Sequence, residues 1–196
     1  KALAYGGGIY STAKLKVNNS DISYNKADAQ ILVYQMWTSY FRGVCYGGGI
    51  YNKFSTAGQK SLVSYSTINN NEAKTYIDLA NGEVKGGGIY CNNMDILHNQ
   101  VSDNETYVDL SVSGSQNQGG GIFHNGTGKL YHNHISLNTA EANTIYMSGG
   151  YSSNTYGGGV YSNSPDTISN CLIHNNRATA RNTTDRQAPY NRRTRR

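Results

Sequence analysis

Short apolar segments alternate with polar residues at a period of two along the chain. Aliphatic side chains recur at every second position in four segments, namely Ile31/Val33, Ile77/Leu79, Val108/Leu110/Val112 and Ile145/Met147. This alternation predicts half-buried β-strands, whose successive side chains point to opposite faces. The 3.6-residue period of an amphipathic helix is missing from these segments, so we expect an all-β protein.

The sequence consists of five copies of one repeat. Each copy carries three glycines followed by an aliphatic and an aromatic residue, and the triplets begin at Gly6, Gly47, Gly86, Gly119 and Gly157. A second motif, [IV]-x-x-N-x-[AT], places one asparagine in register in every copy: Asn25, Asn71, Asn104, Asn138 and Asn176. Five residues before this motif stands another aliphatic residue: Val17, Val63, Ile96, Leu130 or Ile168. Matched copies of this length are the signature of a solenoid.

A single repeat cannot bury its apolar side alone, but stacked repeats share one continuous thin core. Each repeat offers about three short strands, and parallel crossovers favour a right-handed path. We therefore predict a right-handed parallel β-helix of about five coils over residues 1–179, roughly 24 Å long at about 4.8 Å per coil. Residues 180–196 lack the alternation and are rich in arginine, so we expect a disordered or irregular tail there.

The glycines and asparagines are predicted to serve the fold. Three glycines suit a corner that needs positive φ or close approach between coils. A phosphate-binding loop would need a GxGxxG or GxxxxGK[ST] pattern that runs from a strand into a helix, and the triplets do not fit it. Asparagine tolerates left-handed turns, and its amide can bond to the asparagine of the next coil, so we expect an asparagine ladder.

The aromatic residue after each triplet is the best candidate for binding. Because the preceding Ile or Val points inward, the aromatic column should point outward; it comprises Tyr10, Tyr51, Tyr90, Phe123 and Tyr161. One interpretation is a self-stacking ladder that stabilises the sheet. The other is a flat, exposed platform for sugar rings or for the surface of a partner protein.

Composition and charge narrow the possible partners. The chain has 196 residues, 17 tyrosines and a net charge of +5. Residues 177–196 hold seven arginines and one acid, a net charge of +6, so residues 1–176 carry −1. A nearly neutral body gives no reason to expect nucleic acid as a partner. The sequence also lacks an 18-residue apolar run, so we expect no membrane insertion.

Candidates for catalysis and metal binding are few. Asp78 in TYIDL and Asp109 in TYVDL match in sequence and could form an acid/base pair on adjacent coils. His132 and His134 form an HxH without a third ligand at suitable spacing, so we expect no metal site. The three cysteines lie far apart, and none belongs to a CxxC motif. We expect no cofactor.

The segment KLKVNNSDISYNKA at 14–27, together with GGGIY, resembles repeats of bacterial surface-exposed β-helix proteins. These include the choice-of-anchor β-helix proteins and the passengers of polymorphic outer-membrane proteins and autotransporters, whose GGAI and FxxN repeats are related. The resemblance implies an extracellular or cell-surface location and an adhesive, stalk-like or spacer role. The wider pectate-lyase-like superfamily adds polysaccharide cleavage as an alternative, although its catalytic residues have no counterparts here.

Three functions follow from these observations. The first is a non-enzymatic, secreted or surface-displayed module for adhesion, as a stalk or for assembly through its lateral surface, with a glycan or a partner protein as ligand. The second is a polysaccharide lyase or hydrolase. The third is a filament subunit that associates end to end, because open sheet edges invite stacking.

Overall fold

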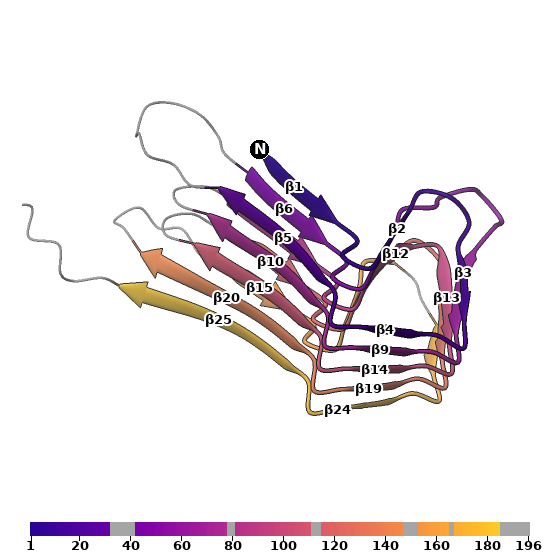
Figure 1. Ribbon diagram of the computed structural model, residues 1–196. Coiled ribbons are helices and arrows are strands. Elements are labelled where there is room, and N and C mark those ends of the chain that lie inside the picture. Colours follow the sequence, from indigo (N-terminus) through magenta and orange to yellow (C-terminus); the bar gives the residue numbers. More distant parts are fainter. Residues whose placement is uncertain (32–41, 78–80, 111–114, 147–152, 165–166, 185–196) are drawn as a thin grey trace, which may run out of the picture.

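The computed structural model describes residues 1–31, 42–77, 81–110, 115–146, 153–164 and 167–184. These residues form 25 β-strands and no helix. The strands assemble into five parallel sheets, and each sheet takes one strand from each of five successive coils (Figure 1). The protein is therefore a parallel β-solenoid of five coils, as the repeat predicts.

We name the sheets A to E in the order in which each coil visits them. Sheet A contains β1 (Ala2–Tyr5), β6 (Arg42–Tyr46), β11 (Asn81–Lys85), β16 (Gln116–Gln118) and β21 (Asn154–Tyr156). Sheet B contains β2 (Ile9–Ser11), β7 (Ile50–Asn52), β12 (Ile89–Asn92), β17 (Ile122–Asn125) and β22 (Val160–Ser162). Sheet C contains β3 (Lys16–Asn18), β8 (Ser61–Ser64), β13 (Met94–Leu97), β18 (Lys129–Tyr131) and β23 (Thr167–Ser169).

The last two sheets complete each coil. Sheet D contains β4 (Asp21–Ser23), β9 (Thr67–Asn69), β14 (Gln100–Ser102), β19 (His134–Ser136) and β24 (Leu172–His174). Sheet E contains β5 (Lys26–Ile31), β10 (Glu72–Ile77), β15 (Glu105–Leu110), β20 (Thr139–Tyr146) and β25 (Arg177–Thr184).

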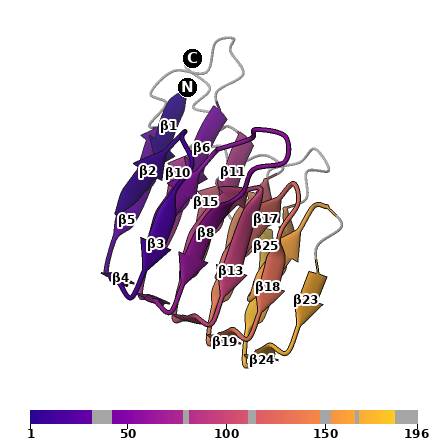
Figure 2. The same ribbon diagram turned by 90° about the vertical axis from the view of Figure 1, so that its right-hand side faces the viewer.

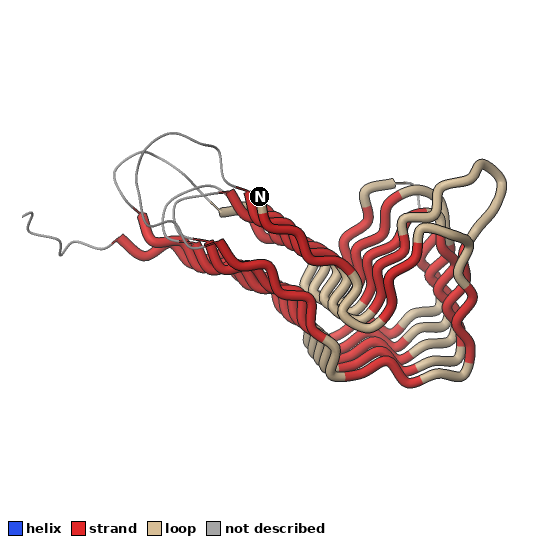
Figure 3. The backbone as a smooth tube through the Cα atoms, turned by 45° about the horizontal axis from the view of Figure 1, so that its top comes forward, coloured by secondary structure: helices blue, strands red, loops and turns tan. Residues whose placement is uncertain are grey.

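The cross-section has two parts, each with its own core (Figure 3). Sheets B, C and D surround a three-sided lumen filled by aliphatic columns, one of which is Val17, Val63, Ile96, Leu130 and Ile168. Sheets A and E extend from this lumen and pack face to face through small residues such as Ala27, Ala73 and Cys45. Full burial of one aliphatic side chain contributes about 1.5–3 kcal/mol, so five stacked layers suffice for a thin core.

The count of three strands per coil is too low, because each coil has five. Sheets C and D are both formed by the segment that runs from the column of Val17 to the [IV]-x-x-N-x-[AT] motif, and a corner of two residues separates them. Sheet A was not expected at all, since strands such as Gln116–Gln118 are polar. Gln116–Gln118 pairs with one strand on each side, and this pairing outweighs the low β-propensity of its polar side chains.

Three of the corners have a fixed length in every coil, and the other two connections vary. Three residues always join sheet A to sheet B, and two residues always join C to D and D to E. The connection from B to C ranges from the single residue Asn93 to residues 53–60. The sequence repeat is therefore kept in register by its corners, while length differences are confined to the remaining connections.

The fixed corners each contain a residue in the left-handed backbone conformation, with positive φ. The first glycine of each triplet has φ between 61° and 69°, as the sequence predicts. The corner between sheets D and E has its positive φ at Tyr24, Asn70, Asp103, Leu137 and Asn175. Asparagine and aspartate adopt this region readily, but for other L-residues it costs roughly 1–2 kcal/mol. Tyr24 and Leu137 are therefore strained positions that the stack holds in place.

The asparagine ladder is confirmed at the corner between sheets D and E. In each step an asparagine donates its backbone and side-chain N–H groups to the side-chain oxygen of the next asparagine, at 2.9–3.1 Å. A second ladder at the corner between C and D uses Ser20, Ser66, Asn99, Asn133 and Cys171. Both ladders satisfy backbone amides that the tight bends leave without strand partners.

The domain boundary also needs correction. Strand β25 continues to Thr184 and pairs along its whole length with β20, so residues 180–184 belong to the solenoid. Residues 185–196 lie outside the described part of the chain.

Candidate functional site

The predicted aromatic column lies in an angle between sheets A and B. The glycine triplet turns the chain sharply there, so the last residues of the sheet A strands face the aromatic residues of sheet B. The sheet A positions are Tyr5, Tyr46, Lys85, Gln118 and Tyr156. We call this surface the aromatic notch.

The five aromatic residues of sheet B form a continuous stack. Neighbouring ring centroids lie 5.0–5.4 Å apart, with interplanar angles of 7–18°. Rings from sheet A join this stack, since Tyr5 lies 4.9 Å from Tyr51 and Tyr46 lies 4.7 Å from Tyr90. Each such contact is worth about 0.5–1.5 kcal/mol beyond its buried area.

The expected exposure of this column is wrong for its three central members. Tyr51, Tyr90 and Phe123 are only 4%, 8% and 3% exposed, whereas Tyr10 on the first coil is 58% exposed. The side chains do point away from the lumen, but sheet A covers them from the other side of the notch. A flat platform of five rings is therefore absent, and the self-stacking interpretation describes the geometry.

Charged side chains gather over the middle of the notch. The Lys85 ammonium lies 4.8 Å from the ring centroid of Phe123 and 5.6 Å from that of Tyr46, in cation–π contact. It also pairs with Glu83 at 2.6 Å, and Glu83 pairs in turn with Arg42. Burial, with a smaller effect from Arg42, lowers the pKa of Lys85.

The tyrosine hydroxyls in the notch have altered acidity. Burial is the main cause that raises the pKa of Tyr51 and of Tyr90 to about 12, and neighbouring tyrosines add to the effect. Burial also raises the pKa of Tyr46 strongly. These phenols therefore stay protonated at neutral pH, and none is activated as a base or nucleophile.

The candidate acid pair does not occupy equivalent positions. Asp109 lies opposite Tyr76 on one neighbouring strand and Asn143 on the other. Register places Asp109 two residues from the position that corresponds to Asp78, and Asp78 itself lies outside the described residues. The distance from the ladder asparagine gives the correct register, because the corner has a fixed length. The catalytic role stays a prediction.

Histidines gather on the outer surface near sheets C and D. His98 stacks on Tyr65 and lies 4.9 Å from His132, measured between ring centroids. The Nε2 atoms of His134 and His174 lie 2.8 Å apart, so one ring donates a hydrogen bond to the other. Within the described part of the chain, no three His, Cys, Asp or Glu side chains gather in a way that could hold a metal ion.

The cysteines have structural surroundings. The Cys45 thiol donates to the carbonyl oxygen of Ala27 at 2.9 Å, and burial raises its pKa to about 12. Cys91 is fully buried in the lumen. Cys171 accepts the last bond of the ladder from the Asn133 amide at 3.4 Å. A low pKa and exposure, which a nucleophilic thiol needs, are both missing from Cys45.

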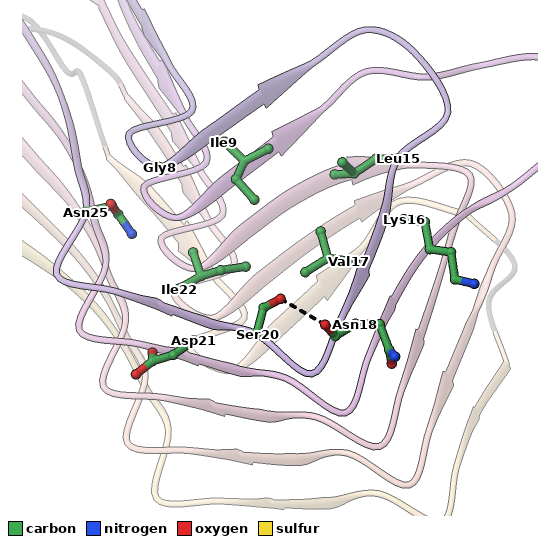
Figure 4. A pocket seen from close by; sticks show the side chains of 10 residues that line it. All are labelled: Gly8, Ile9, Leu15, Lys16, Val17, Asn18, Ser20, Asp21, Ile22 and Asn25. Carbon is green, nitrogen blue, oxygen red and sulfur yellow. Dashed lines mark hydrogen bonds between the residues drawn. The ribbon is translucent and has the colours of Figure 1, made fainter.

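The sequence does not predict the hollow that lies at the first coil. The first coil ends in an open hollow of about 800 Å³, whose lining includes Ile9, Leu15, Val17, Ile22 and Asn25 (Figure 4). Most of these residues are the first members of the internal columns, so the hollow is the open end of the lumen. The outward position of the first repeat in the stack was the only signal that could have revealed it.

Protein-family models, curated proteins and solved structures all give no match to the chain. Among the described residues, no helix is long and apolar enough to cross a membrane.

Proposed function

We propose that the chain is a non-enzymatic structural module of a secreted or cell-surface protein, and that it acts as a stalk or spacer. The observation that supports this proposal is that the side chains repeated in each coil mainly contact the neighbouring coils. The asparagines, the glycines and the central aromatic residues, which recur in every coil, contact their equivalents in the next coil. The repeat thus encodes coil-to-coil contact.

The aromatic notch supports a spacer better than an adhesive platform. An aromatic binding platform would need several neighbouring rings with free faces, but the three central rings of the notch are buried. The cell-surface location is supported only by the resemblance of the repeats, and labelling of intact source cells with an impermeant reagent tests it.

Duplication of one coil tests the spacer directly. Residues 86–118 form one full repeat of 33 residues, so a second copy inserted after Gln118 preserves every column. We expect the longer chain to fold and to gain about 4.8 Å along the solenoid axis. Its melting temperature should rise, because each added coil adds an interface. Small-angle scattering and calorimetry measure both quantities.

A matched control duplicates only residues 100–118, which adds strands for sheets D, E and A but none for sheets B and C; the incomplete coil should destabilise the protein. Failure of the full-coil duplication to fold would contradict a modular spacer. Release of products from a panel of polysaccharides, abolished by Asp109→Asn, would show instead that the chain is an enzyme. Binding on a glycan array that Tyr10→Ala abolishes would favour adhesion.

A further inference from the structure

We propose that His134 and His174 form a surface site for one divalent transition-metal ion, with Cu²⁺ as the preferred ion. The two histidines belong to β19 and β24, which lie side by side in sheet D (Figure 2). They are 40 residues apart in the chain, so spacing along the sequence does not reveal the pair. The proposal goes beyond the spacer role and does not depend on it.

The two imidazole rings contact each other directly. Their Nε2 atoms lie 2.8 Å apart, and one ring donates its N–H to the other. Among the described residues, each ring has the other as its only hydrogen-bond partner, so a binding ion replaces this one bond. Imidazole nitrogen is a suitable ligand for Cu²⁺, Ni²⁺ and Zn²⁺.

The separation of the nitrogens discriminates between these ions. Two nitrogens with metal bonds of about 2.0–2.1 Å lie about 2.8–3.0 Å apart at a right angle, whereas a tetrahedral angle separates them by about 3.3–3.4 Å. Neighbouring ligands stand at right angles in the tetragonal complexes of Cu²⁺ and Ni²⁺, while zinc sites are tetrahedral. The spacing of 2.8 Å therefore fits Cu²⁺ and Ni²⁺, and of these two Cu²⁺ binds a given set of nitrogen ligands more tightly.

Binding requires only local changes in the pair. The ring that donates must move its proton from Nε2 to Nδ1, because a metal ion binds a nitrogen lone pair. Both rings must also turn so that their Nε2 lone pairs converge on the ion. The side chain of His134 is exposed and that of His174 is half-buried. Water therefore reaches the pair and supplies the remaining ligands.

The backbone beneath the pair is held at both ends by the ladder corners. Before the two strands, the amide of Asn133 donates to the Cys171 sulfur at 3.4 Å. After them, the amide of Asn138 donates to the side-chain oxygen of Asn176 at 2.9 Å. Between these corners β19 and β24 pair residue for residue. The stack thus fixes the distance between the two histidine backbones in advance, which lowers the entropic cost of binding.

Few charges surround the pair. The five strands of sheet D contain no lysine or arginine, and apart from the histidines their only ionisable side chain is that of Asp21 on the first coil. Arg177 is the cation nearest to His174 along the chain, and its guanidinium pairs with Glu141 at 2.9 Å. No lysine or arginine of sheet D therefore opposes a divalent cation at the pair.

The test is titration of the intact 196-residue chain with Cu²⁺, followed by calorimetry and by electron paramagnetic resonance. We expect one ion per chain, and hyperfine structure from two imidazole nitrogens in the resonance spectrum. Because the unfolded chain lacks the preformed pair, bound Cu²⁺ should also raise the melting temperature.

Removal of one ligand tests the assignment. Loss of even an indirect partner of a metal ligand lowers metal affinity by about 10–100-fold, so His174→Gln should lower it by about tenfold or more. His98→Gln is the matched control, because His98 is an exposed histidine of the same outer surface that stacks on Tyr65 instead. This control should leave the affinity unchanged.

Addition of a ligand tests the register. Leu172 is 59% exposed and lies directly opposite His134, two residues before His174. Leu172→His therefore places a third imidazole beside the pair and should raise the affinity by about tenfold or more. Leu172→Ala removes the same side chain without adding a ligand and should leave the affinity unchanged.

A chain that binds no Cu²⁺ would overturn the proposal. Binding that survives His174→Gln, or that disappears with His98→Gln, would overturn it as well. None of these results bears on the spacer role, because the duplicated coil probes contacts between coils and needs no ion.

Discussion

Asn104 donates its backbone N–H and its side-chain N–H to the same oxygen, the Oδ1 of Asn138, at 3.0 and 2.9 Å. The side chain of Asn104 also donates to the carbonyl of Ile68 at 2.8 Å, and its own Oδ1 accepts the two N–H groups of Asn71. A single fully buried amide thus joins three successive coils. Substitution of a ladder asparagine therefore breaks bonds to two neighbouring coils at once.

Replacing Asn104 with leucine should destabilise the protein strongly. The change removes the acceptor of two buried N–H groups, and each buried group left unsatisfied costs about 1–3 kcal/mol. We expect the free energy of unfolding, measured with urea, to fall by about 3 kcal/mol or more. Asn25→Leu is the control, because the Asn25 oxygen accepts no bond in the described structure of the single chain; it should cost clearly less. Equal losses would contradict the ladder's role.

Replacing Leu137 with asparagine should stabilise the protein. Leu137 has φ of 57° and is 52% exposed, so its side chain gains little from packing while its backbone is strained. Asn70 and Asn175 occupy the same corner in other coils. We expect a gain of about 1 kcal/mol in the free energy of unfolding. Leu137→Ala keeps the strained Cβ and should give no such gain.

Replacing Gly87 with alanine should disrupt the stack. The added Cβ would collide with two rigid backbone carbonyl oxygens, that of Gly120 on the next coil and that of Glu105 in sheet E of the same coil. We expect loss of cooperative unfolding in calorimetry. At Gly58 a Cβ would meet no atom within 4 Å, so Gly58→Ala carries only the cost of its positive φ, about 1 kcal/mol. A Gly87→Ala protein as stable as Gly58→Ala would refute close approach of the coils.

Alkaline pH should destabilise the aromatic notch. Unfolded tyrosines lose their proton near pH 10, whereas the pKa of Tyr51 and of Tyr90 in the folded protein is about 12. Between these values the unfolded chain binds fewer protons than the folded one, so the free energy of unfolding falls as pH rises. Urea denaturation at several pH values above 10 measures the slope.

Tyr90→Phe should make that slope shallower, because it removes one of the late-titrating phenols while keeping the ring. Tyr24→Phe, which alters a tyrosine that is 81% exposed and lies outside the aromatic notch, is the control variant. A slope that does not respond to Tyr90→Phe would mean that this phenol is accessible to water in the folded protein.

The sequence predicts those parts of the fold that repeat with distinctive chemistry. Glycine triplets mark a corner because few other residues tolerate positive φ, and the aliphatic column from Val17 to Ile168 fills the lumen. Strands such as Gln116–Gln118 could not be predicted, because their pairing depends on neighbouring coils and not on their own side chains. The repeated residues therefore determine how the coils stack. Strands without a distinctive pattern of their own, such as Gln116–Gln118, form because this stacking gives them partners on both sides.

The candidate site shows a second limit of sequence reasoning. Alternation correctly places Tyr51 on the outer side of its strand, but it cannot tell whether that side meets solvent. The answer depends on the angle between sheets A and B, which closes Tyr46 and Lys85 over the stacked rings. The register of Asp109 was misread for a related reason, since the resemblance of TYIDL and TYVDL conceals a shift of two residues.

The fixed corners have a practical consequence for redesign. Because the register is fixed at three corners, an insertion in the B-to-C connection leaves every column aligned, as residues 53–60 already do beside the single Asn93 of the next coil. In the described part of the chain these connections follow one another on one side of the solenoid, at about the 4.8 Å spacing of adjacent strands (Figure 3). Peptide epitopes grafted there would form a one-dimensional array, and the distance between adjacent coils would set the spacing between the epitopes.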